Sequence, residues 1–419
     1  MSGPGRRDVF RIRGFFAYWA SYTVSGFGTY VTTLALQVLV LVSLHGTAAD
    51  IGLLNAARWL PYLVLGLVVG ALVDRRRRRP VLIGSDLGRA VLLALIPLFF
   101  VLGVLNIPVL LAIVCAVGLL SLFGDAASQS LVPRIVPRGA LLAAHARTDQ
   151  SDAVAQTSGP LVAGALVSLV GAASAIVVDA VSYLFSAVAI WRVRVDEPPA
   201  TATPARSLRR EIAEGLRWVY RHPVLGPMAF GSHGWFFFNS ILGTVFVPFA
   251  LLALDLSAFQ LGIALAGAGV AGLIGSSVSI RVGRRWGAGV AVVASNLLMA
   301  VGWVLIATVP GDAATWLVVT VLTVGQGFYG LGLGLSNANE MGYRQAVTPD
   351  ELQARTNTTM RSANRAMIVV GAPIGGLAAT VIGYRPTLWI AIAGIVVVTV
   401  FLALSPFGRA RHASDDVVG

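Results

Sequence analysis

The sequence lacks lysine, has a single cysteine and is poor in charge of either sign. Because Cys115 is alone, the chain can form neither an intramolecular disulfide nor a cysteine-based metal site. Without lysine there is no glycine-rich phosphate loop ending in Lys-Ser/Thr, which excludes ATP as the energy source. Charged residues make up only 12% of the 419 residues, too few to give a water-soluble protein of this size its polar surface.

Hydrophobic residues make up 56% of the chain, and the mean hydropathy is +0.79. Apolar runs recur from end to end, each near the ~20 residues with which a helix crosses a bilayer. Strands at these positions would leave backbone groups unpaired in lipid, so we expect helices. The sequence thus predicts an all-α membrane protein with twelve transmembrane helices. We place them at residues 15–42, 51–73, 81–104, 107–130, 147–170, 173–192, 224–252, 258–280, 288–309, 314–338, 357–382 and 386–405.

The arginines indicate on which side of the membrane each loop lies. They precede the first span and follow every even-numbered span, whereas the alternate loops carry almost none, with Arg385 as the exception. By the positive-inside rule, a multi-pass protein of the cell membrane with both termini in the cytoplasm is predicted. The net charge of +12 lies in these loops without interleaved aromatic residues, so nucleic-acid binding is not expected.

The two halves of the chain resemble each other at positions about 210 residues apart. Residues 136–148 are similar to 347–356, and Gly159-Pro160…Gly164 is similar to Ala372-Pro373…Gly376. Both members of each pair have the same orientation, which indicates two parallel six-helix repeats. We therefore expect an N-terminal bundle over 1–192, a cytoplasmic linker over 193–222 and a C-terminal bundle over 223–419.

The linker contains a predicted amphipathic helix. Leu208, Ile212, Leu216 and Val219 share one helical face, and arginines flank it. Such a helix either lies on the cytoplasmic leaflet of the membrane or is a solvated connection between the bundles.

Several motifs resemble those of the major facilitator superfamily. The loop from Gly70 through Asp74 to Arg79 is similar to the signature loop of that superfamily, although Arg77 stands where glycine is common. Residues 158–164 resemble the Gly-Pro motif of its antiporters. Residues 131–137, 179–183, 211–218 and 344–355 resemble the branch that contains macrolide and tetracycline efflux pumps and the enterobactin exporter.

The resemblance covers residues 15–405 and implies two six-helix bundles that work by alternating access. It implies a small-molecule substrate, protons and the lipid bilayer as partners, with neither a cofactor nor a metal, in a chain expected to be a monomer. Many drug–proton antiporters of this superfamily carry an acid in span 1 or an arginine in span 4. This chain has neither, so the coupling residues cannot be transferred directly.

Ionisable residues inside spans are costly in hydrocarbon, so each is expected to have a partner or a task. The candidates for proton coupling are Asp125, Asp179, Arg58 and Asp152. Asp125, in span 4, is expected to face the central cavity. Arg58 and Asp179 lie at similar depth and could pair, or each could face the cavity, and Asp179 could instead serve helix packing. Asp152, one turn from Asp149 in span 5, could instead anchor a helix end.

A second group of charges is predicted near the cytoplasm. Asp74, Arg78, Asp86 and Arg89 would form a charge cluster, which the resemblance makes a gate latch. A purely topological role of the arginines is the alternative.

Polar and aromatic residues of three spans are candidates for a substrate pocket. They are Tyr22, Ser25, Thr29 and Gln37 of span 1, His233, Trp235 and Asn239 of span 7, and Gln326 and Tyr329 of span 10. An aromatic wall suits flat or cationic substrates, and helix packing is the alternative. Small and kinking residues of spans 5 and 11 are expected to allow conformational change: Gly159, Pro160, Gly164, Pro373 and Gly376.

These observations predict a secondary active transporter, with proton-coupled efflux of small amphipathic compounds as the leading function. A proton-coupled importer or a facilitator of a small solute is the alternative within transport. A membrane-embedded enzyme would need a clustered site, whereas the ionisable groups here are scattered over the spans. A non-transporting sensor has no distinguishing feature in this sequence.

Overall fold

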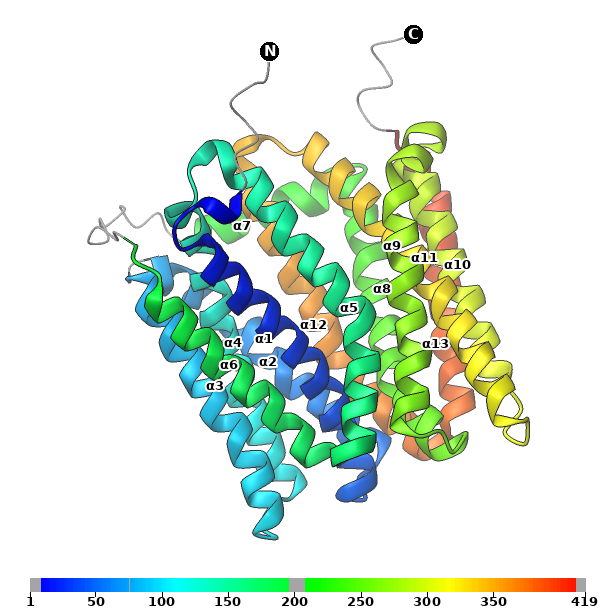
Figure 1. Ribbon diagram of the computed structural model, residues 1–419. Coiled ribbons are helices and arrows are strands. Elements are labelled where there is room, and N and C mark those ends of the chain that lie inside the picture. The colour runs from blue at the N-terminus through cyan, green and yellow to red at the C-terminus, as the bar shows by residue number, and fades with distance from the viewer. Residues whose placement is uncertain (1–8, 75, 196–207, 412–419) are drawn as a thin grey trace. The chain divides into compact units, whose positions relative to one another are not determined.

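The structure is a computed structural model that describes residues 9–74, 76–195 and 208–411 (Figure 1). The described residues form helices and connecting turns, with no strand among them. The first half contains α1 (Phe15–Val38), α2 (Ala48–Asp74), α3 (Arg78–Val101), α4 (Ile107–Ile135), α5 (Leu141–Val170) and α6 (Ala172–Arg192). The second half contains α7 (Leu208–Arg221), α8 (Leu225–Pro248), α9 (Ala258–Trp286), α10 (Ala288–Thr308), α11 (Thr315–Val347), α12 (Asp350–Ile382) and α13 (Tyr384–Leu404).

Within the described residues, eleven helices are long and apolar enough to cross a membrane. The 27-residue α2 coincides with the remaining predicted span. The prediction of an all-helical membrane protein is confirmed, but five helices extend beyond the predicted spans by five residues or more. α4, α9 and α11 end later, and α5 and α12 begin earlier. Hydropathy detects only the apolar part of a helix, and these helices continue into polar sequence.

Local sequence determines how several of these helices begin. The side chain of Asn106 accepts a hydrogen bond from the backbone N–H of Val109 at 3.0 Å, which caps the start of α4. At the start of α9, Ser257 and Gln260 cap each other's backbone N–H groups in a capping box. α6, α10 and α13 each begin directly after a glycine with positive φ. The turns before these three helices are therefore short.

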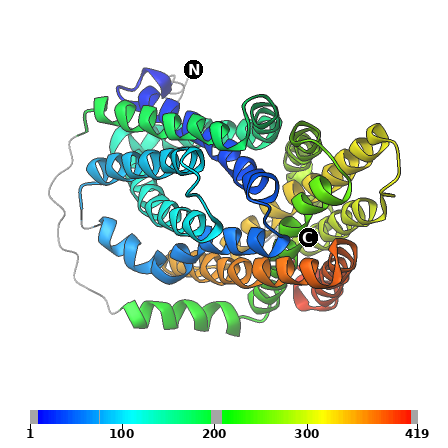
Figure 2. The ribbon, with the colours of Figure 1, turned by 90° about the horizontal axis from the view of Figure 1, so that it is seen from below.

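The chain divides into two compact units. The first consists of residues 1–46 and 57–203, and the second of residues 47–56 and 204–419. In the first unit α1 packs against α5 and α6, and α3 packs against α4 and α6 (Figure 2). In the second unit α8 packs against α12 and α13, and α10 packs against α11 and α13. The helix neighbours of the second unit thus repeat those of the first, as a parallel duplication requires.

The repeat extends to local backbone geometry. α1 continues into a π-helical turn, η2 (Leu39–Ser43), and α8 continues into a matching turn, η4 (Phe249–Ala253). Each turn is followed by a non-glycine residue with positive φ, His45 at 52° and Asp255 at 51°. The sequence did not predict this feature, because the residues of the two turns differ.

The linker helix α7 belongs to the second unit, where it packs against α8 and α12. Val219 is buried among Leu225 and Met228 in a hydrophobic cluster of this unit. Gly215 lies against Thr359 and the backbone of α12. Leu216, from the same predicted face, is exposed, so only part of that face packs on the bundle. The side chains of residues 208–211, and with them Leu208, lie outside the described part.

Two arginines bind the carboxyl ends of neighbouring helices. Arg79, near the start of α3, donates hydrogen bonds to the carbonyl groups of Ile190 and Trp191 at the end of α6. Arg385, in α13, donates to the carbonyls of Ala307 and Val309 at the end of α10. Cations are favourable at helix carboxyl ends, where carbonyl groups lack partners. The arginine that departs from the loop-charge pattern is therefore held by a structural contact.

Candidate functional site

The first unit contains a polar cavity of about 380 Å³. An adjoining cavity of about 200 Å³ shares six lining residues with it: Thr29, Thr33, Arg58, Arg89, Asp125 and Tyr183. Eight of the residues singled out from the sequence line the larger cavity: Tyr22, Ser25, Thr29, Arg58, Asp86, Arg89, Asp125 and Asp152. A ninth, Asp179, lines the smaller one. Most candidate ionisable residues of the first half are thus brought together in one place.

One wall of the cavity is a stripe of hydroxyl groups along α1. Ser25 donates a hydrogen bond to the carbonyl of Ser21, Thr29 to that of Ser25, and Thr33 to that of Thr29. These bonds to the preceding turn satisfy the hydroxyl protons inside the span, while the oxygens remain able to accept. Ser21 and Thr33 were not among the residues predicted for a pocket, although they continue the same four-residue spacing along α1 on which Ser25 and Thr29 lie.

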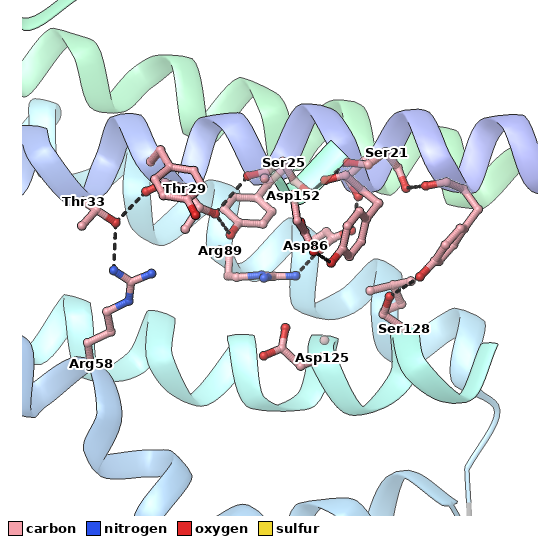
Figure 3. A pocket seen from close by; sticks show the side chains of 18 residues that line it. Ser21, Ser25, Thr29, Thr33, Arg58, Asp86, Arg89, Asp125, Ser128 and Asp152 are labelled. Carbon is pink, nitrogen blue, oxygen red and sulfur yellow. Dashed lines mark hydrogen bonds and ion pairs between the residues drawn. The ribbon is translucent and has the colours of Figure 1, made fainter. Parts of the chain in front are cut away.

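Two aspartates on the facing helices each accept a hydrogen bond from a tyrosine. Tyr22 of α1 donates to Asp152 of α5 at 2.6 Å. Tyr62 of α2 donates to Asp125 of α4, also at 2.6 Å. Figure 3 shows Asp125 pointing from α4 toward the helices opposite it. Among the described residues, neither carboxylate lies within 4.0 Å of a basic group. Both are therefore polar, solvent-accessible groups without a cation.

Asp86 and Arg89 form a buried ion pair on α3, with exposed fractions of 1% and 7%. Ser186 of α6 donates to the second oxygen of Asp86 at 2.6 Å. The guanidinium of Arg89 also lies over the ring of Tyr183, 4.1 Å from its centroid. Hydrogen bonds, an opposite charge and an aromatic face compensate in part for the burial of both charges, because the buried Nε of Arg89 has no hydrogen-bond partner among the described residues.

The predicted cytoplasmic charge cluster is described only in part. Asp86 and Arg89 pair with each other and line the cavity, whereas Arg78 stands at the start of α3, two turns or about 12 Å along the helix axis before Asp86. The side chain of Asp74 lies outside the described part. The cluster of all four residues and its role as a gate latch stay a prediction.

Arg58 and Asp179 do not form an ion pair within the described part of the chain. Arg58 donates to Thr33 of α1 at 2.8 Å, and Ser182 donates to Asp179 at 3.0 Å. Both residues line the smaller cavity. The pairing is thus not seen in the described part, and a role of Arg58 or Asp179 in proton coupling stays a prediction.

The small residues of α5 and α12 lie at close helix contacts. A β-carbon added to Gly159 would stand 2.7 Å from the β-carbon of Tyr30 on α1. Gly376 of α12 lies against the backbone of Ala48, within the second unit. Gly164 is buried, and Pro160 and Pro373 lie inside their helices. A conformational role of these residues stays a prediction.

The other pocket candidates lie elsewhere. Gln37 is on α1 but lines neither cavity. Gln326 is 3% exposed, and Tyr329 packs edge-on against Trp303 with ring centroids 5.8 Å apart. Trp235 contacts Phe236, and His233 is bonded on both sides of its ring. His233, Trp235, Asn239, Gln326 and Tyr329 all belong to the second unit. The role of these five residues in a substrate pocket stays a prediction.

The cavity has the chemistry of a binding site. It offers carboxylates that can attract a cation or take up a proton, hydroxyl groups that can donate or accept, and aromatic rings. Tyr18 and Tyr22 are stacked with centroids 6.2 Å apart, and Tyr18 is 2.8 Å from Ser128. In the described residues, no three histidine, cysteine, aspartate or glutamate side chains gather as they would to hold a metal ion.

Comparison with known proteins gives the chain a family. The family model of transmembrane secretion effectors matches residues 3–416. The uncharacterized MFS-type transporter YfiS of Bacillus subtilis is 28% identical over 51% of this chain and 51% of its own length. The multidrug efflux pump Tap of Mycolicibacterium fortuitum is 30% identical over 49% of this chain and 52% of its own length. The chain thus spans about half the length of these curated relatives.

The fold also resembles solved transporters. The crystal structure of the nucleoside transporter NupG superposes with a TM-score of 0.76, covering 93% of this chain and 98% of that one, at 11% identity. At this identity the likeness concerns the arrangement of the helices alone.

Proposed function

This chain belongs to the transmembrane secretion effector family within the major facilitator superfamily, and we propose that it exports small amphipathic compounds in exchange for protons. It is a multi-pass membrane protein and a transporter rather than an enzyme. The substrate class, the coupling ion and the direction are the proposed part.

The observation that carries the proposal is the pair of carboxylates in the cavity of the first unit. Asp125 and Asp152 face the same cavity, and each is held by a tyrosine instead of a basic group. An aspartate paired with an arginine would stay ionised, and the guanidinium would occupy its carboxylate oxygens. A carboxylate held only by a hydroxyl can bind either a proton or a cation.

This competition supplies a mechanism for exchange. When Asp125 is ionised, it attracts the positive end of an amphipathic substrate, and the stacked rings of Tyr18 and Tyr22 contact its apolar part. When a proton binds Asp125, the charge that held the substrate is lost and the substrate leaves. Because one carboxylate serves both ligands, binding of one opposes binding of the other. Alternating access of the two bundles would then expose the cavity to each side in turn.

The proposal of export is supported by the relatives. Tap is named a multidrug efflux pump, and the family model describes secretion effectors. The Gly-Pro motif at Gly159 and Pro160 also resembles that of the antiporters of the superfamily. Uptake driven by protons is the competing proposal, and the sign of the coupled proton movement separates the two.

The test is substrate-induced proton flux in proteoliposomes that contain the full chain and a pH-sensitive dye. A fluorescent lipophilic cation and a macrolide serve as probes. For export by exchange, an imposed gradient that is acid inside should drive the probe into the vesicles and protons out. Asp125→Asn should abolish the proton movement, because an amide side chain does not take up a proton in the pH range of the assay.

Asp149→Asn is the matched control. Asp149 lies on the same helix as Asp152, one turn away, and does not line the cavity, so its variant should retain flux. If only Asp179→Asn removes the flux, exchange stands and the assignment to Asp125 is wrong. If a probe crosses without proton movement, proton coupling is refuted. If probe and proton move in the same direction, the protein is an importer.

A further inference from the structure

Three helices of the second unit meet at the imidazole ring of His233. This residue lies on α8 and is 9% exposed. Its Nε2 is 2.8 Å from the hydroxyl oxygen of Tyr220 on α7, and its Nδ1 is 2.6 Å from Oδ1 of Asn364 on α12. The ring therefore connects the linker helix to two of the spans.

The hydrogen bonds around the ring define where its proton lies in the neutral state. The amide nitrogen of Asn364 donates to the hydroxyl of Ser232 at 3.3 Å, which leaves Oδ1 as the acceptor toward the ring. Nδ1 of His233 must then carry the proton and donate it to Asn364. Nε2 is left with a lone pair, which accepts the hydrogen bond from the Tyr220 hydroxyl.

The same partners also fit the charged ring. When Nε2 takes up a proton it becomes a donor, and the Tyr220 oxygen can accept after its hydroxyl proton rotates away. The bond from Nδ1 to Asn364 does not change. The ring thus keeps both hydrogen bonds in both charge states, so protonation leaves no buried polar atom of the ring unpaired.

Two aromatic rings and one acidic residue lie near His233. The ring centroids of Tyr220 and Phe230 lie 5.9 and 6.5 Å from that of the imidazole, at interplanar angles of 57° and 81°. From α11, Glu340 lies close to Ser232, whose hydroxyl accepts the hydrogen bond from Asn364. Burial disfavours a charged ring, and an ionised carboxyl group nearby offsets part of that cost.

The helices around His233 carry further charged groups. They are Arg344 on α11, Arg361 and Arg365 on the turns of α12 next to Asn364, and Glu214 of α7, which pairs with Arg355 of α12. α13 presents the apolar side chains of Val398 and Leu402 to Gly234 and Gly231 of α8. Among the described residues, no basic group lies within 4.0 Å of the Glu340 carboxyl group. An ion pair therefore does not neutralise it.

We propose that His233 is a second proton-binding site of this transporter, which exchanges its proton through the hydroxyl group of Tyr220 on α7. α7 lies outside the apolar spans, and Tyr220 is only partly buried, so its hydroxyl offers the Nε2 atom of the ring a hydrogen-bonded route toward the surface of that helix. The proton at His233 would accompany the exchange at Asp125 in the first unit. This last step rests on the proposed function, whereas proton binding by the ring does not.

The first measurement is an NMR titration of the full chain in nanodiscs, with ¹³C-labelled histidine. The chain has five histidines, and His233→Gln identifies the signal of His233 by its absence. The ring signal should move with a midpoint between about pH 5 and 8. In Tyr220→Phe the midpoint should shift to lower pH by about half a unit or more, because the charge-assisted bond to the hydroxyl is lost. A signal that stays constant from about pH 4 to 9, or an unshifted midpoint in Tyr220→Phe, overturns the proposal.

The second measurement is the pH dependence of probe-driven flux in proteoliposomes. An inflection present in the wild type should disappear in His233→Gln and remain in His145→Gln, an exposed histidine of the first unit. If the ring titrates but His233→Gln keeps the inflection, the coupling of this site to transport is refuted. If no probe crosses in the wild type, the proposed function fails, and the NMR titration, which needs no transport, still decides whether His233 binds the proton.

Discussion

Gly28 of α1 lies directly against the carboxyl group of Asp179 on α6. A β-carbon added to this glycine would overlap the side-chain oxygens of both Asp179 and Ser182. Asp179 is 2% exposed and is held by Ser182, so it cannot move aside without losing that bond or opening the helix contact. The glycine is therefore what allows an ionisable group to be buried between these two spans.

Gly28→Ala is expected to destabilise the protein by about 1–3 kcal/mol, the usual cost of overpacking a well-packed contact. Thermal unfolding of the purified protein in detergent measures the loss. Gly26→Ala is the matched control on the same helix, because a β-carbon there has no neighbour within 4 Å. Equal unfolding temperatures for the two variants would contradict the close contact.

Removing one partner of the buried pair on α3 is expected to be costly. Arg89→Met leaves Asp86 without its cation, and loss of one partner of a buried ion pair costs about 3–5 kcal/mol. Arg355→Met, which breaks the more exposed pair with Glu214, should cost about 1 kcal/mol or less. Chemical unfolding of both variants compares the two losses. Similar losses would show that the burial of Asp86 and Arg89 does not determine their contribution.

Asp152→Asn is expected to weaken the binding of a cationic probe about tenfold, equivalent to about 1.4 kcal/mol, because a charge in the cavity is lost. Tyr22→Phe should have a smaller effect, since it removes only the hydroxyl that orients the carboxylate. Fluorescence titration of the detergent-solubilised protein with the probe gives both affinities. A neutral probe of the same shape should bind all three proteins alike, and a parallel loss for that probe would indicate misfolding.

Arg385→Ala is expected to destabilise the protein by about 1–2 kcal/mol, because two carbonyl groups at the end of α10 lose a charged donor. The guanidinium also lies 5.4 Å from the ring centroid of Phe249. Arg284→Ala, at an exposed site, is the control for unfolding temperature. Because Arg385 is held by structural contacts, its removal should leave the topology unchanged in a cysteine-accessibility assay, and an inverted topology would refute this role.

His222, between α7 and α8, predicts a pH dependence of stability. Its Nδ1 accepts hydrogen bonds from the backbone N–H groups of Val224 and Leu225, at 3.2 and 3.1 Å, and burial lowers the pKa of the ring. A lowered pKa in the folded state means that the neutral ring stabilises the fold. This stabilisation is complete above the unfolded pKa of about 6.5 and is lost as the pH falls through the folded pKa.

Unfolding temperatures of the wild type should therefore fall between about pH 7 and pH 5. In His222→Asn part of this fall should disappear, because asparagine caps a helix start without titrating in this range. His145→Asn, at an exposed position, should keep the slope of the wild type. Parallel curves for all three proteins would exclude a contribution of His222.

The sequence predicted the spans well because hydrophobic length is a local property. It also identified Asp125, Asp152 and Arg58, since a charge inside an apolar run is visible without knowledge of the fold. It did not identify Tyr62 as the donor to Asp125, because that contact joins α2 to α4 and depends on which faces of two helices meet. Contacts of this kind are made by tertiary packing, and a single sequence carries no record of them.

His233 shows the same limit from another side. The sequence grouped it with Trp235 and the phenylalanines that follow because they are adjacent in the chain. In a helix consecutive side chains point to different sides, so adjacency does not place residues on one wall. Its actual partners, Tyr220 and Asn364, lie 13 and 131 positions away in the chain, on two other helices.

Arg79 was counted only as a loop charge, although its contacts at the end of α6 make it part of the helix packing.

The paired π-helical turns bear on the ancestry of the chain. A π-helical turn arises when a helix accommodates one extra residue, and here the extra residue stands at the same place in α1 and in α8. Two independent insertions would have had to coincide, whereas a single insertion in an ancestral six-helix unit explains both after one duplication. The residues of the turns have since diverged, Leu39–Ser43 against Phe249–Ala253, while their backbone has not. In this chain the shape of the main chain preserves a common origin at positions where the side chains no longer show it.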